Sequence, residues 1–164
     1  IEMIEDIVLS GKSEDIVGRL YELGAMKGVE LSSKVVEKLS RLVMHADPAV
    51  REAVALTAGI RLRIPSMYPI FLESLREFEN SAQVLPPLID AATVLVLHGS
   101  GDRDVLSKLL GGLVVNGEQP DEVRGVAYLA LQRLWGRISQ IDYAMAPRNL
   151  SEMMPDMPFI ESVL

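Results

Sequence analysis

The two histidines are the residues whose types come closest to metal or acid–base chemistry. His45 and His98 each stand where a predicted helix ends. A histidine there interacts favourably with the free carbonyl groups of the last turn, whereas a zinc site needs further ligands at a defined spacing. The chain has no cysteine, which excludes thiol catalysis and cysteine-ligated zinc. We therefore interpret both histidines as helix caps and expect no metal and no other cofactor.

Asp90 is the one carboxylate in the apolar stretch from Leu88 to Leu97. An ionised carboxylate among apolar residues has to be paired or to reach the surface. We interpret Asp90 as a hydrogen-bonding residue between structural units or as a residue at an exposed edge. A catalytic acid would need a second carboxylate or a histidine on the same face, and the sequence places none there convincingly. We therefore assign no catalytic residue, and we expect the protein not to be an enzyme.

Side chains of mixed charge follow the second helix of each predicted helix pair. If these helices line one groove, the side chains point into a surface that binds a protein or a peptide. The alternative is an ordinary solvated face. The residues of this predicted groove face are Lys34, Lys38, Arg41, Glu73, Arg76, Glu77, Arg103 and Lys108.

Helical periodicity dominates the elements that position these residues. Between Leu31 and Val43, apolar residues recur three, four and seven positions apart, with charged residues between them. Asp47-Pro48 is typical of a helix start, and no segment shows the sustained alternation of a strand. The sequence predicts helices at residues 2–9, 14–26, 31–45, 48–62, 66–79, 83–98, 102–114, 120–135 and 139–146, followed by an irregular tail.

The predicted helices form pairs that repeat along the chain. Aligning Val17, Val50, Leu88 and Val123 gives spacings of 33, 38 and 35 residues, a period typical of helical repeat arrays. Each unit needs its neighbours to cover its apolar face. We expect a single domain, 1–164, whose repeat units cover about residues 14–45, 48–79, 83–115 and 120–146. Residues 147–164 would then form a cap over the last unit or a docking segment.

The segment from Asp47 to Ala58 resembles the first helix of a HEAT repeat of the short, lyase-like type. The pattern of that helix is Asp-x-x-Val-Arg-x-x-Ala-x-x-Ala-Leu. This segment keeps the Asp-Pro-x-Val-Arg opening, but Val54 replaces the first alanine and Thr57-Ala58 replaces the closing Ala-Leu. Residues 123–131 match the rest of the pattern, with Pro120 in place of the aspartate.

This resemblance implies an all-α, right-handed superhelix of about four antiparallel helix pairs. It implies a protein-interaction or scaffold module whose groove is lined by the second helices. Some relatives are enzymes or bind small molecules, which is the alternative function. In this family the arginine at the positions of Arg51 and Arg124 ties adjacent repeats together through a neighbouring acid. The candidate acids are Asp47, Glu52, Asp90, Asp121 and Glu122.

Composition argues against two classes of partner. The chain has 164 residues and a formal net charge of −7, which disfavours nucleic acid because phosphate backbones attract basic surfaces. No apolar run reaches the ~18 residues of a membrane-spanning helix. The N-terminus is acidic, so we expect no signal peptide and a cytoplasmic location. The partner is therefore expected to be a protein or peptide, or a second copy that docks on the methionine-rich tail.

Overall fold

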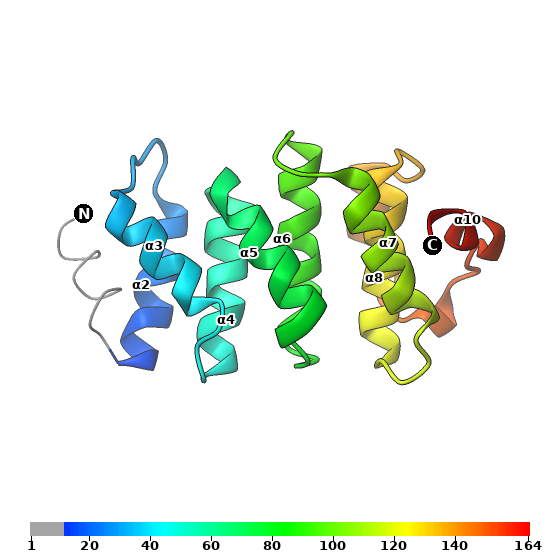
Figure 1. Cartoon of the computed structure of the whole chain (residues 1–164), viewed down its shortest axis with the longest axis horizontal. Helices are drawn as coiled ribbons and strands as arrows, with labels where there is room; N and C mark the ends of the chain where they lie inside the picture. Colours follow the sequence, from blue (N-terminus) through cyan, green and yellow to red (C-terminus); the bar gives the residue numbers. More distant parts are fainter. Residues whose placement is uncertain (1–11) are drawn as a thin grey trace.

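The computed structural model describes residues 12–164, which fold into helices arranged in two layers (Figure 1). No strand occurs in this range, so the predicted all-α class is confirmed. The first layer contains α2 (Ser13–Ala25), α4 (Pro48–Val54) continued by η1 (Ala55–Arg61), α6 (Leu85–Leu97) and α8 (Asp121–Leu134). The second layer contains α3 (Ser33–Leu42), η2 (Pro65–Met67) leading into α5 (Tyr68–Glu73) and η3 (Ser74–Phe78), and α7 (Arg103–Val115). The helix predicted at residues 2–9 lies outside the described range.

Several helix starts follow from local capping chemistry. The Asp47 carboxylate accepts a hydrogen bond from the backbone N–H of Ala49 at 2.9 Å, and Pro48 occupies the first turn of α4. Asp102 caps α7 in the same way, at 2.8 Å from the backbone nitrogen of Asp104. These caps satisfy N–H groups that have no partner within the helix. The capping prediction at Asp47-Pro48 is therefore confirmed.

Two predicted helices depart from regular α geometry. The segments η1 and η3 are π-helical, and the N–H of Leu62 donates to the carbonyl of Thr57 at 2.9 Å. In η1, Gly59 lies so close to α6 that a side chain there would overlap the Cβ of Ala91. The helices predicted at 48–62 and 66–79 are therefore present, but each contains a π-helical segment that the sequence did not predict. The spacing of apolar residues in a sequence does not distinguish a π-helical segment from an α-helix, because the difference depends on how the segment packs against its neighbours.

The apolar residues of both layers form one continuous core. It extends from Ile16 in α2 to Ile160 near the C-terminus. Fully buried side chains such as Phe71, Leu95 and Leu131 come from both layers. The inner helices α6 and α8 are buried on several faces, which accounts for their largely apolar sequences.

The C-terminal segment is more regular than the sequence predicts. After α9 (Gln140–Met145), the expected irregular tail contains η4 (Leu150–Glu152) and a helix, α10 (Met157–Val163). Asp156 caps α10 by accepting a hydrogen bond from the N–H of Phe159 at 3.1 Å. Leu150 and Ile160 are buried, so the segment packs on α8 and α7. Met154 remains 96% exposed.

Candidate functional site

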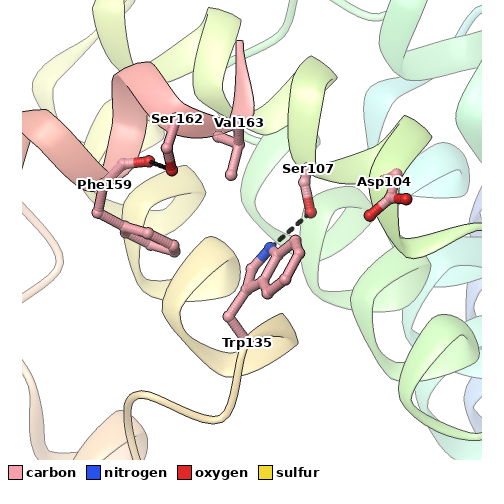
Figure 2. A pocket seen from close by; sticks show the side chains of 6 residues that line it. All are labelled: Asp104, Ser107, Trp135, Phe159, Ser162 and Val163. Atoms are coloured by element: carbon pink, nitrogen blue, oxygen red, sulfur yellow. Dashed lines mark hydrogen bonds between the residues drawn. The ribbon is translucent and has the colours of Figure 1, made fainter.

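Three hollows are lined by second-layer helices and the elements next to them. The smallest, about 170 Å³, lies on α3 and is lined by Lys34, Glu37, Lys38 and Arg41. The largest, about 510 Å³, lies between η3 and α7, and we call it the η3–α7 groove. The third, about 450 Å³, lies between α7, the end of α8 and α10, and we call it the aromatic pocket (Figure 2). The predicted cations of α3 therefore do lie together.

The η3–α7 groove combines apolar and amide side chains. Phe78, 41% exposed, and Leu113 belong to its apolar lining. The predicted residues Arg76 and Glu77 also line it. Two other predicted residues, Glu73 and Lys108, are exposed but line none of the three hollows. The remaining residues of the groove are Leu75, Glu79, Asn80, Leu109, Gly112, Asn116 and Gln119.

The aromatic pocket is held open by contacts of its own walls (Figure 2). The indole N–H of Trp135 donates to the Ser107 hydroxyl oxygen at 2.9 Å, and that hydroxyl donates to the carbonyl of Arg103 at 2.6 Å. The predicted residue Arg103 lies over the Trp135 ring, with its guanidinium carbon 3.9 Å from the ring centroid. Phe159 of α10 forms the opposite side. These contacts restrain the rings and preform an apolar slot.

Arg51 forms a buried ion pair that joins α4 to the end of η3. Its Nε is 2.7 Å and its Nη2 is 3.1 Å from the two carboxylate oxygens of Glu79, and its Nη1 donates to the carbonyl of His45 at 2.7 Å. The acid is therefore Glu79, which is absent from the predicted set of partners. His45 also differs from its prediction as a cap, because its Nδ1 accepts a hydrogen bond from the N–H of Asp47. A tight turn between α3 and α4 produces this arrangement.

Arg124 reaches a backbone group instead of an acid. Its Nε donates to the carbonyl of Val114, in the last turn of α7, at 2.8 Å. The C-terminal carbonyls of a helix carry partial negative charge, so this contact stabilises the α7–α8 packing without a carboxylate. Asp121, one of the predicted partners, instead accepts hydrogen bonds from the backbone and hydroxyl of Ser151.

Asp90 is held by a phenol from the C-terminal segment. The hydroxyl of Tyr143, on α9, donates to its carboxylate. The guanidinium carbons of Arg133 and Arg148 lie 4.3 Å and 4.7 Å from the centroid of the Tyr143 ring. Burial raises the pKa of Asp90, and the Tyr143 hydrogen bond and the two cations oppose that shift. Burial and the Asp90 charge raise the pKa of Tyr143, which keeps its hydroxyl protonated as the donor.

The same carboxylate lines a cavity of about 540 Å³ on the first layer, which we call the Asp90 cavity. The sequence interpretation that no histidine shares the face of Asp90 was wrong. His98, the residue directly after α6, lies two helical turns beyond Asp90 and lines the same cavity. The spacing of Asp90, Val94 and His98 is a signal that could have revealed this face. The lining residues from other elements are Ile60, Arg63, Arg133, Gln140 and Tyr143.

Replacing Asp90 by asparagine is expected to change how stability depends on pH. The folded state holds the Asp90 proton more tightly than the unfolded chain, because burial raises its pKa above 3.8. Stability therefore falls as the pH rises between 3.8 and the raised pKa. Asp90→Asn cannot ionise, yet its amide oxygen can still accept the Tyr143 hydrogen bond. Relative to the wild type, the variant should gain stability across that interval and keep the gain above it.

Urea unfolding of both proteins at a series of pH values measures this difference. Asp104→Asn is the matched control, because Asp104 is exposed on α7. If the wild-type and Asp90→Asn stabilities ran parallel through the acidic range, burial of the Asp90 charge would not affect stability.

Comparison with known proteins identifies no relative. No family model, no curated protein and no solved structure matches the chain. Within residues 12–164, no helix is both long and apolar enough to cross a membrane. The same range contains no group of three or more histidine, aspartate or glutamate residues placed to hold a metal ion. The functional argument therefore depends on the surfaces described above.

Proposed function

We propose that the protein is a non-enzymatic interaction module with a HEAT-like, right-handed superhelical architecture, and that it binds an extended segment of a partner protein along its second layer. The observation that carries this proposal is that three hollows are lined by helices of that layer or elements beside it. Alternation of first and second helices between two layers supports the repeat architecture.

The η3–α7 groove has the chemistry that a peptide backbone requires. Asn80, Asn116 and Gln119 each present both a donor and an acceptor, so they can pair with N–H and C=O groups of an extended chain. Phe78 and Leu113 offer apolar contact to the partner's side chains. A volume of about 510 Å³ accommodates several such side chains. The opposite charges of Arg76 and Glu77 would select the orientation of the bound segment.

The aromatic pocket suits an apolar anchor side chain. Interface energy concentrates where a few large side chains fill preformed, desolvated pockets. Trp135 and Phe159 form such walls, and their positions are restrained by Arg103 and Arg137, whose guanidinium carbons each lie 3.9 Å from the centroid of the ring they cover. The α7 helix lies between this pocket and the η3–α7 groove and lines both. One extended segment, which advances about 3.3 Å per residue, would use both sites.

Peptides selected from a random displayed library on the full chain test this function. We expect selected peptides to bind the wild type and to lose at least about tenfold in affinity for Arg76→Glu, because a favourable charge contact at the groove becomes repulsive. Phe78→Ala should weaken binding through lost apolar contact. Affinities are measured by fluorescence anisotropy of the labelled peptides.

The matched control is Lys27→Glu, a charge reversal at an exposed lysine in the turn after α2. This variant should bind the selected peptides with less than about twofold change, since it lies away from the groove. The proposal fails if no peptide is enriched, or if enriched peptides bind the Arg76→Glu variant as tightly as the wild type.

A further inference from the structure

The Asp90 cavity is a second, separate site on the first layer. Residues from four helical elements and the ends of two of them meet there. They are Ile60 from η1, Asp90 from α6 and His98 directly after it, Arg133 from α8, Tyr143 from α9, and Arg63 from the turn after η1. Its volume of about 540 Å³ lies within the range of small-molecule sites. None of these side chains belongs to the proposed peptide surface, so the cavity needs an explanation of its own.

Two arginines of this cavity hold no carboxylate. The ion pairs in the described part of the chain involve Arg19, Arg41, Arg51 and Arg137, and neither Arg63 nor Arg133 is among them. Arg133 donates instead to the side-chain oxygen of Gln140 at 2.8 Å. Such neutral contacts orient a guanidinium without pairing it directly with a carboxylate.

Arg63 is oriented by His98 in a defined tautomer. Nδ1 of His98 lies 2.8 Å from the carbonyl oxygen of Val94, so Nδ1 carries a proton. Nε2 lies 2.8 Å from Nη1 of Arg63, and a guanidinium can only donate, so Nε2 accepts. The imidazole therefore holds Arg63 in place without neutralising it.

The backbone at Arg63 is in a costly conformation. Its φ of 51° lies in the left-handed region, where it is the sole non-glycine residue among those described. An arginine in this region is strained relative to glycine, which has no Cβ, and such strain concentrates at binding sites. Arg63 lies in the turn after the π-helical segment η1, one residue beyond its C-cap, Leu62. The N–H of Ile64 donates to the carbonyl of Ala58 at 2.9 Å and holds this turn. A glycine would fit this turn with less strain, but it would lack the cation.

Positive charge accumulates here on an otherwise acidic protein. Arg63 and Arg133 line the cavity, and Arg148 lies against Tyr143, with its Nη1 buried and without a hydrogen-bond partner. Asp90 is the one acid that lines the cavity. The whole chain has a net charge of −7, so this local excess of cations is opposite in sign to the net charge of the protein.

We infer that the Asp90 cavity binds a small organic anion, whose carboxylate or phosphate oxygens are held by Arg63 and Arg133 and whose hydrocarbon part lies against Ile60 and Val94. Guanidinium groups match the planar or tetrahedral arrangement of these oxyanions through paired N–H donors. Asp90 and Gln140 can accept a hydrogen bond from a hydroxyl or amino group on the ligand. The two apolar side chains give the remainder of the ligand a water-poor surface.

Three aromatic probes of matched size test this inference on the full chain. Benzoate carries a carboxylate, phenyl phosphate a phosphate, and benzyl alcohol no charge. Each is titrated at constant ionic strength while the amide and arginine Nε–H signals are followed by NMR. We expect at least one anion to shift signals of the cavity residues with saturation and benzyl alcohol to shift none. The anion that binds more tightly identifies the oxyanion class.

Arg63→Gln and Arg133→Gln should each weaken the bound probe by about tenfold or more, since each removes charge-assisted hydrogen bonds. Arg61→Gln is the matched control, because Arg61 is an exposed cation two residues away that does not line this cavity, and it should change affinity less than about twofold. Arg63→Gly should lose binding and unfold at the same or a higher temperature, which separates lost binding from lost folding.

Three results would overturn the inference. The first is that neither anion shifts cavity signals beyond the effect of chloride. The second is that benzyl alcohol binds as well as the anions do. The third is that the Arg63 and Arg133 variants bind the probe as tightly as the wild type.

Discussion

Replacing Gly125 by alanine is expected to lower the free energy of unfolding by about 3 kcal/mol, at the upper end of the usual cost of overpacking. Gly125 is buried in α8, where the C-terminal segment crosses the helix. A Cβ at this position would overlap the carbonyl oxygen of Arg148 and lie 2.8 Å from the backbone nitrogen of Leu150. Both are backbone atoms, so no side-chain rotation relieves the clash. The segment must move away from α8 or the helix must shift.

The displaced segment should be detectable directly. Urea unfolding measures the loss of stability, and limited trypsin digestion measures cleavage after Arg148, which should become faster than in the wild type. The control is Gly112→Ala in α7, where an added Cβ has no neighbour within 4 Å. That variant should gain about 0.5–1 kcal/mol, because alanine loses less conformational freedom than glycine in a helix. Equal stability of Gly125→Ala and the wild type would show that the segment does not rest on α8.

Removing one partner of the Arg51–Glu79 pair is expected to cost about 3–5 kcal/mol. The two side chains are only 10% and 1% exposed. Glu79→Ala leaves the Arg51 guanidinium buried with backbone carbonyls as its remaining acceptors. An uncompensated buried charge costs more than the pair contributes. The prediction is therefore a large drop in the urea midpoint without a change in the denaturant slope.

Two comparison variants isolate the cause. Glu37→Ala breaks the Arg41–Glu37 pair, whose side chains are 72% and 64% exposed, and should cost less than about 1 kcal/mol. The double variant Arg51→Met with Glu79→Leu removes both charges and should recover most of the lost stability. If Glu79→Ala and Glu37→Ala lowered the free energy of unfolding by the same amount, burial of the Arg51–Glu79 pair would have no effect on stability.

Helix positions follow closely from the sequence. The predicted helices at 14–26, 83–98 and 120–135 agree with α2, α6 and α8 within a few residues. Apolar period and capping residues are local signals, and both act within a single helix. The π-helical turns at 55–61 and 74–78 were not predicted, because they depend on contacts such as that of Gly59 with α6. The helix α10 was missed because its short, proline-containing sequence carries little periodic signal.

For the candidate sites, too, the sequence identified individual residues but not their partners. The sequence identified Asp90 as a carboxylate that must be either paired or exposed. It also identified charged second-layer residues that line the α3 hollow and the η3–α7 groove. It did not identify Tyr143 as the partner of Asp90, because the two residues are 53 positions apart in the chain. Likewise, Glu79 is 28 positions from Arg51. Pairings over such distances depend on how helices stack, and one sequence carries no direct signal for them.

The sequence by itself determined the all-α class and the positions of most helices, because these properties depend on residues within a few positions of each other. Only the tertiary structure decided which charges meet. It placed Arg63, Asp90, Arg133 and Tyr143 around one cavity and folded the C-terminal segment over α8. The physical reason is that a cavity or an ion pair is a property of the packing between elements, where the position of each side chain depends on its neighbours.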